Sequence, residues 1–104
     1  MIYEQRTYTC HPGKLQEFID TYEREGVDLQ MQVLGNLVGY FTTEIGPLNQ
    51  AIHIWAFDSF EVRLARRAEL WSKPEWLDFA AKVNPMLSVT ESKIMLPTKF
   101  SPLK

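Results

Sequence analysis

The segment 50–57 constrains the fold more than any other part of this sequence, because it has the pattern of a strand that is apolar on both faces. Successive side chains of a strand point to opposite faces, so Ile52 and Ile54 share one face while Trp55 and Phe57 share the other. A strand of this kind needs cover on both faces. Leaving apolar side chains of this size in water costs roughly 1.5–3 kcal/mol each, so the fold has to supply two covering layers.

Turn residues and hydrophobic periodicity divide the rest of the chain into further elements. Alternating β-forming residues predict three more strands, and stripes at i, i+3 and i+4 predict the helical stretches between them. Gly26 and Gly35 are suitable helix stops. The strands are expected at about 2–10, 37–44, 50–57 and 89–96, and the helical stretches at about 15–25, 27–34, 59–71 and 74–83.

The helix expected over 59–71 has a capping signal and one apolar stripe. Asp58 is the predicted N-cap, and Glu61 lies three residues later in the capping-box position. The apolar stripe, expected to face the core, comprises Phe60, Leu64, Ala68 and Trp71. The opposite face is interpreted as a solvated one, on which Glu61 and Glu69 dilute the basic residues Arg63, Arg66 and Arg67.

The order β-α-β-β-α-β predicts an α+β domain of the ferredoxin-like kind, with a four-stranded antiparallel sheet and helices on one face. We assign Trp55 and Phe57 to the uncovered face of that sheet. A second copy packed sheet against sheet would cover them, which predicts a homodimer. The alternative is that the C-terminal tail 99–104 folds back over this face, but so short a segment is too small to cover it.

Bulk properties exclude several classes of protein. A length of 104 residues fits a single domain spanning 1–104. The net charge of -2 argues against nucleic-acid binding, which requires clustered Lys and Arg. Cys10 is the only cysteine, so neither an internal disulfide nor a cysteine-based zinc site is expected. There is no signal-peptide pattern, and no apolar run approaches the ~20 residues of a membrane span, so we expect no membrane span and a cytoplasmic location.

The residues around the third strand resemble the central block of the NIPSNAP family. The resemblance rests on VGYFTTEIGPLNQ at 38–50 and HIWAF at 53–57, and the segments 6–9, 12–14 and 76–85 fit the same pattern. It covers about residues 3–102, and Gln5 departs from it where an apolar residue would be expected. The resemblance implies a dimeric α+β barrel. That superfamily includes cofactor-free monooxygenases, lactone isomerases, haem-degrading enzymes and simple binding proteins, so the fold leaves the function open.

Strand alternation and the neighbouring positions of the first and third strands are expected to bring the candidate site residues together on the dimer-facing side of the sheet, opposite the helices and in the barrel interior. His53 is the candidate general base or acid, Arg6 the candidate holder of a carboxylate or enolate oxygen, and Tyr8 a hydrogen-bond donor. The residues expected to contact the ligand are Glu4, Tyr40, Trp55 and Phe57. Two structural alternatives stand beside this reading: Arg6 and Glu4 form only an ion pair, or His53 is only a hydrogen-bonded core histidine.

Three functions therefore remain open. The first is a cofactor-free isomerase or monooxygenase that acts on a small aromatic or enolisable acid. The second is a binding module for an apolar ligand, haem included, with His53 as the axial ligand. The third is an interaction protein whose interior is packed core. A resident metal is not expected, because His11 and His53 are the only histidines and have no ligand spacing, and no phosphate-binding or nucleophile motif is present.

Overall fold

The structure, a computed structural model, describes residues 1–104 and contains four strands and four helices. In chain order the elements are β1 (Ile2–Cys10), α1 (Leu15–Glu25), α2 (Val27–Leu34), β2 (Asn36–Thr42), β3 (Gln50–Phe57), α3 (Phe60–Trp71), α4 (Pro74–Val83), a 3₁₀ turn (Asn84–Met86) and β4 (Leu87–Met95). The predicted bounds of β1, β3 and α2 are confirmed, and β2 and β4 begin and end within two residues of the predicted positions. None of the helices has the length and apolarity needed to cross a bilayer.

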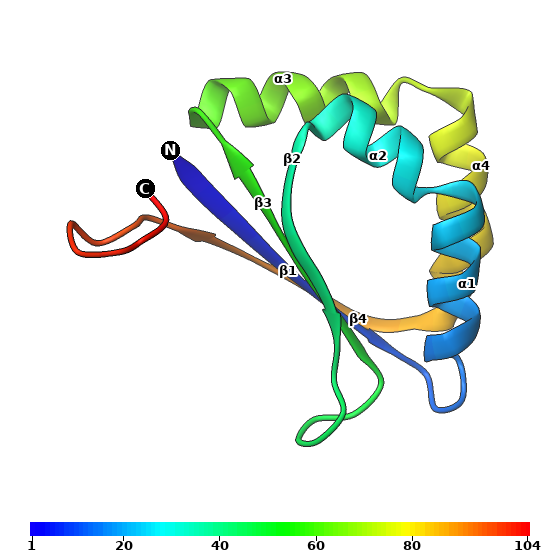
Figure 1. The fold of residues 1–104 in the computed structure, drawn as a ribbon. Helices are drawn as coiled ribbons and strands as arrows, with labels where there is room; N and C mark the ends of the chain where they lie inside the picture. Colours follow the sequence, from blue (N-terminus) through cyan, green and yellow to red (C-terminus); the bar gives the residue numbers. More distant parts are fainter.

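The four strands form one antiparallel sheet in the order β2-β3-β1-β4. All four helices lie on one side of this sheet, with α2 and α3 over one end and α1 and α4 over the other (Figure 1). The predicted ferredoxin-like α+β fold is therefore confirmed. Each of its two helical connections is broken into two helices, at Gly26 in the first and at Ser72 and Lys73 in the second.

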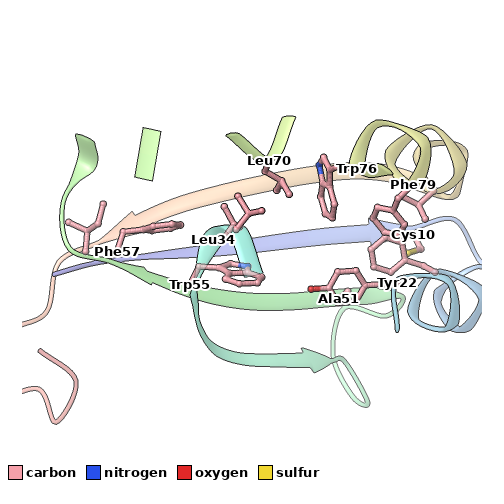
Figure 2. Packing of buried hydrophobic residues seen from close by; sticks show 13 residues of the cluster. Cys10, Tyr22, Leu34, Ala51, Trp55, Phe57, Leu70, Trp76 and Phe79 are labelled. Atoms are coloured by element: carbon pink, nitrogen blue, oxygen red, sulfur yellow. The ribbon is translucent and has the colours of Figure 1, made fainter. Parts of the chain in front are cut away.

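The assignment of Trp55 and Phe57 to the uncovered face of the sheet is wrong. Trp55 is 0% exposed and Phe57 2% exposed in a single chain, and both belong to the cluster that packs between the sheet and the helices, with Leu34 of α2 above Trp55 (Figure 2). Alternation tells which residues share a face, but it does not tell which face the helices will cover. The covered face is the one that carries the larger aromatic rings, because the helices bury more apolar surface there.

The outer face of the sheet carries the other set of alternating residues. Ile52 and Ile54 are half-buried on it, and Phe41 and Val89 are more than half exposed. The C-terminal tail returns beside the N-terminus (Figure 1) and covers one end of this face, where the Tyr3 hydroxyl donates to the Lys104 carbonyl at 3.1 Å. The tail thus covers part of the outer face, and the region around Ile52 stays open.

Helix α3 presents its faces in the opposite sense to the predicted one. Its apolar residues Phe60 and Leu64 are 54% and 67% exposed, whereas Arg63 donates to the buried Glu4 carboxylate on β1. Trp71, which is 45% exposed, lies on the Arg63 side of the helix and packs edge-on against Trp76 of α4. Arg66 is also partly buried, and its Nη1 donates to the carbonyl of Leu34 at 2.7 Å. The arginine stems cover apolar surface while their guanidinium groups satisfy a carboxylate and the C-terminal end of α2.

Two local predictions differ from the structure by one residue. The N-cap of α3 is Ser59, whose Oγ accepts from the backbone N–H of Val62 at 3.1 Å, and not Asp58. In α2 the hydrophobic pattern predicts Val27, Met31 and Leu34 on one side, but Gln30 is buried and the neighbouring Met31 is 43% exposed. A polar side chain is tolerated inside because the Tyr22 hydroxyl donates to Gln30 Oε1 at 2.6 Å.

Candidate functional site

A cavity of about 170 Å³ lies between the helix-covered face of the sheet and helices α1 and α4. Strands β1, β2, β3 and β4 supply its floor, and aromatic side chains supply most of its wall. The lining residues that the argument below uses are Arg6, Tyr8, Tyr40, His53, Trp71 and Trp76. It is thus a concave, mainly apolar site with a few polar groups, the usual form of a small-molecule site.

His53 lies at the centre of the floor and is held in place from three sides. Its ring stacks on Tyr40 with the ring centroids 4.5 Å apart, and it meets the edge of Tyr8 at 4.9 Å. Trp55 Nε1 donates a hydrogen bond to His53 Nδ1 at 2.7 Å. An indole nitrogen can only donate, so Nδ1 is unprotonated and the proton of the neutral ring is on Nε2.

His53 is only 1% exposed, and its buried Nε2–H has no hydrogen-bond partner in the chain. Buried polar groups without partners are rare and costly. Because His53 lines the cavity, this donor is available to a molecule inside it. Trp76 Nε1, another buried donor of the lining, is unpartnered in the same way.

The protonation state of His53 follows from its surroundings. Burial and the nearby Arg6 charge lower the pKa of His53 to about 3, against a smaller opposite effect of Glu4. The ring is therefore neutral at pH 7 and acts there as a hydrogen-bond donor. A general acid or base at neutral pH needs a pKa near the working pH, so this geometry favours the donor role over the acid–base role expected from the sequence.

Arg6 and Tyr8 form a connected pair beside His53, which is the direct cross-strand partner of Arg6. Arg6 Nε donates to the Tyr8 hydroxyl at 2.8 Å, and Arg6 Nη1 donates to Glu4 Oε2 at 2.9 Å. Since the Tyr8 oxygen accepts from Arg6, its own O–H is oriented away from that donor and can donate to another acceptor. Arg6 has three further N–H groups without a partner in the chain.

Glu4 is the anchor of this polar cluster. Its carboxylate accepts from Arg6, from Nε and Nη2 of Arg63 at 2.9 Å each, and from the Ser92 hydroxyl. Burial alone would raise the pKa of Glu4, but the hydrogen bonds from Arg63 and Ser92 and the charge of Arg6 together lower it to about 2. Glu4 is therefore ionised and fully occupied by protein partners.

The structure brings four of the seven sequence-predicted site residues into the cavity lining and leaves three outside it. Arg6, Tyr8, Tyr40 and His53 line the cavity. Arg6, Tyr8 and His53 therefore lie on the helix-covered face of the sheet, and their predicted position on the dimer-facing side is wrong. Glu4, Trp55 and Phe57 do not line it: Glu4 holds the arginines, and the two aromatic rings are packed core.

Sequence reasoning missed the helical half of the wall. The paired Tyr22 and Gln30, and the orphan donor of Trp76, come from α1, α2 and α4. The signal for Gln30 is its position three residues before Val33 and four before Leu34, on the side of α2 that these two buried residues occupy. Burial raises the pKa values of Tyr22 and Tyr40, so both phenols stay neutral.

Haem does not fit the donor set at His53. An imidazole that binds iron through Nε2 needs that nitrogen unprotonated, with the proton on Nδ1 donated to an acceptor. Here Nδ1 faces the Trp55 donor, so the proton is on the nitrogen that would have to bind iron. No three His, Cys, Asp or Glu side chains lie together in an arrangement that could hold a metal ion either.

Fold and cavity together define a ferredoxin-like α+β protein with a ligand-sized aromatic site between its sheet and its helices. The family model NIPSNAP matches residues 3–102. The chain belongs to the NIPSNAP family. A NipSnap homolog from Dictyostelium discoideum is 34% identical over 99 residues, which is 95% of this chain and 44% of that protein. NipSnap homolog 2 from Homo sapiens is 34% identical over 99% of this chain and 35% of its own length. The chain thus spans less than half the length of these two relatives.

Solved structures show the same relationship. A NIPSNAP family protein of unknown function from Agrobacterium tumefaciens is 47% identical with a TM-score of 0.97, over 100% of this chain and 94% of that one. A NIPSNAP-like domain protein from Burkholderia xenovorans is 46% identical with a TM-score of 0.93, over 97% and 88%. A putative antibiotic biosynthesis monooxygenase from Nitrosomonas europaea is 10% identical with a TM-score of 0.69, over 93% and 98%. That last likeness is one of fold alone.

Proposed function

We propose that this protein binds a small ring-containing molecule that carries an acceptor oxygen, in the cavity between the sheet and helices α1 and α4. The observation that carries the proposal is the orphan Nε2–H of His53, which is buried, fixed in direction by Trp55 and carried by a residue that lines the cavity. A carbonyl, phenol or enolate oxygen would satisfy it. The net stabilisation from such a bond is about 1 kcal/mol or more, since the unpaired state is costly.

The size and the wall of the cavity support a single aromatic ring. An engineered apolar cavity of about 150 Å³ binds benzene, and the cavity here is about 170 Å³. Tyr8, Tyr40, Trp71 and Trp76 present ring faces and edges to its interior, and such surfaces prefer stacked or edge-on aromatic partners. A larger ligand would have to displace side chains.

The donor set also limits the chemistry. A neutral imidazole and a guanidinium aimed at one oxygen can stabilise a developing enolate or phenolate. No carboxylate lines the cavity, and His53 is neutral with its proton already on the cavity side, so the chain offers no obvious base. Isomerase or cofactor-free oxygenase activity would therefore require a substrate that arrives as its anion or loses its proton readily.

Ligand titration of one His53 variant and one control variant tests the binding proposal. The probe is 4-hydroxybenzamide, with toluene as the ligand that has no acceptor oxygen, followed by tryptophan fluorescence. His53→Phe keeps an aromatic ring against Tyr40 but removes the donor, so affinity for 4-hydroxybenzamide should fall by about tenfold, equivalent to 1.4 kcal/mol, while affinity for toluene stays. His11→Ala, at an exposed histidine, is the control. If neither probe binds the wild-type protein, the interior is a packed core and the interaction-protein alternative is favoured.

We also propose that the protein is a homodimer that pairs through the outer face of its sheet. The support is the open apolar region around Ile52, with Phe41 and Val89 more than half exposed beside it. Glu91 and Lys93 lie on this same face, two residues apart on β4. Around a two-fold axis Glu91 of one copy can meet Lys93 of the other, which makes the surface self-complementary.

Sedimentation equilibrium tests the dimer. The wild-type protein should have about twice the mass of one chain, and its interface should exceed the ~1,000 Å² of a stable contact. Ile52→Lys should shift it to monomer. Leu64→Lys, on the exposed face of α3 behind the helices, should leave the dimer intact. A wild-type monomer with a folded circular dichroism spectrum would overturn this proposal without affecting the cavity.

A further inference from the structure

Two rows of side chains face each other at the edge of the cavity, one on β1 and one on α3. On β1 the row is Glu4, Arg6 and Tyr8, with spacing i, i+2, i+4. On α3 the row is Arg63, Arg67 and Trp71, with spacing i, i+4, i+8. Two strand residues advance by about 6.7 Å and four helical residues by about 6 Å, so the rows keep nearly in step.

Observed contacts show where the two ends of these rows lie. At one end Arg63 holds Glu4 through two bonds of 2.9 Å. At the other end Tyr8 and Trp71 both line the cavity. Between these two ends the ribbons of α3 and β1 diverge toward the end of the sheet where α1 and α4 lie (Figure 1). The middle residues of the two rows are Arg6 on β1 and Arg67 on α3, and both carry a positive charge.

This middle pair lacks a counter-charge. Glu4 is the one carboxylate in the cluster, and Arg63, Ser92 and Arg6 already occupy its oxygens. Arg67 is partly buried and forms no hydrogen bond or ion pair within the chain. Burial lowers the pKa of the Arg67 guanidinium, and the nearby Arg6 charge lowers it further. Two guanidinium groups thus bind the one carboxylate and the third, that of Arg67, has no partner, an arrangement that costs free energy unless an anion joins it.

The orphan donor of His53 lies on the same face, directly across from Arg6. A ligand with its ring among the aromatic walls can therefore present oxygens to two places, the arginine pair and the His53 Nε2–H. Charge-assisted bonds from arginine to a carboxylate are frequently bidentate and are the stronger kind. Arg6 has three N–H groups without a partner that can form such bonds. None of the five N–H groups of the Arg67 guanidinium has a partner in the chain.

We propose that the ligand is an aromatic monoanion, a single ring whose carboxylate or equivalent oxyanion binds between Arg6 and Arg67 and whose second, neutral oxygen accepts from His53 Nε2. This inference rests on the proposed binding function and adds the charge and the polarity of the ligand. The ring then lies across the mouth of the cavity with its charged end toward α3. A neutral ligand of the same shape would leave the positive charges of Arg6 and Arg67 without a counter-charge.

The test compares 4-hydroxybenzoate with its neutral isostere 4-hydroxybenzamide by calorimetric titration. The wild-type protein should bind the benzoate at least about tenfold more tightly than the benzamide. Arg67→Gln should remove this preference by weakening the benzoate alone. The same variant should keep or raise the melting temperature without ligand, because it relieves a repulsion. A merely structural arginine would lower it.

Arg66→Gln is the matched control, since it makes the same charge change one residue away at a side chain committed to the Leu34 carbonyl. It should leave the benzoate preference unchanged. Equal binding of benzoate and benzamide by the wild type, or equal weakening of both in Arg67→Gln, would overturn the anion inference while leaving the binding function standing. Binding of neither probe would overturn both.

Discussion

Trp55, a fully buried core residue, determines where the proton of His53 lies. Its indole N–H donates to His53 Nδ1 at 2.7 Å, so the remaining proton is on Nε2 and faces the cavity. The packing of the core and the chemistry of the site are therefore joined at one hydrogen bond. A site donor fixed in this way needs no rearrangement when a ligand binds.

Trp55→Phe should separate these two roles. The phenyl ring keeps part of the packing but removes the donor, so Nδ1 becomes available for the proton and both tautomers of His53 should be populated. Nitrogen NMR of labelled histidine in the His11→Ala background, where His53 is the only histidine, reads this directly. The wild-type ring should show the Nε2–H form alone. A wild-type signal from the Nδ1–H form would contradict the hydrogen bond.

The stability of the protein should fall on mild acidification because of His53. The folded-state pKa of His53 is about 3, lowered from 6.5, so below pH 6.5 the unfolded chain binds a proton that the folded chain does not. Stability is then lost as pH falls, by up to about 1.4 kcal/mol per pH unit. Urea unfolding at about pH 7 and about pH 5.5 should differ by roughly 1 kcal/mol from this residue. His53→Gln should remove that difference and His11→Ala should keep it.

Glu4 acts at lower pH and in the same direction. Its folded-state pKa is about 2, lowered from 4.5, so the stability it contributes is complete above about pH 4.5 and is lost as pH falls toward 2. Removing the carboxylate leaves Arg6 and Arg63 without their partner. Glu4→Gln should therefore cost about 3–5 kcal/mol in the free energy of unfolding at pH 7, as measured by urea denaturation.

The double variant Arg6→Leu with Glu4→Leu is the sharper comparison. If Arg6 were the only partner of Glu4, removing both would be close to neutral. The structure adds Arg63 with two bonds, so the double variant should still be destabilised, and the triple variant with Arg63→Leu should recover stability. A double variant as stable as the wild type would show that Arg63 contributes little.

The sequence predicted the fold and the proximity of Arg6 and His53, but not which face of the sheet the helices cover or how α3 is oriented. Strand alternation and the neighbouring positions of β1 and β3 suggested that Arg6 and His53 meet. The register that makes them direct cross-strand partners comes from the structure alone. Which face the helices cover was not accessible, since Ile52 and Ile54 are as apolar as the residues opposite them. The reversal of α3 was missed for a related reason: a helix pattern counts arginine as polar, whereas Arg63 is directed inward by the buried Glu4. The cavity depends on the angle between α3 and β1, which no local pattern contains.

Gly35 and Gly13 offer a matched pair for the last prediction. Both have positive φ, +93° and +83°, where an L side chain is strained. Gly35 also has ψ -90°, outside the left-handed helical region. A Cβ at Gly13 meets nothing within 4 Å, whereas a Cβ at Gly35 would collide with Nη1 of Arg66. That nitrogen donates to the Leu34 carbonyl at 2.7 Å and so closes the C-terminal end of α2.

Gly35→Ala should therefore show a backbone cost plus the loss of the Arg66 contact. The Arg66 part is the difference between the cost of Gly35→Ala in the wild-type protein and its cost in an Arg66→Ala background, where no guanidinium remains to be displaced. Measured as free energies of unfolding in urea, this difference should be about 1–3 kcal/mol, the loss expected for a hydrogen bond to a charged group. Gly13→Ala is the control and should cost the same in both backgrounds. Equal costs of Gly35→Ala in the two backgrounds would mean that Arg66 moves aside freely and does not hold the end of α2.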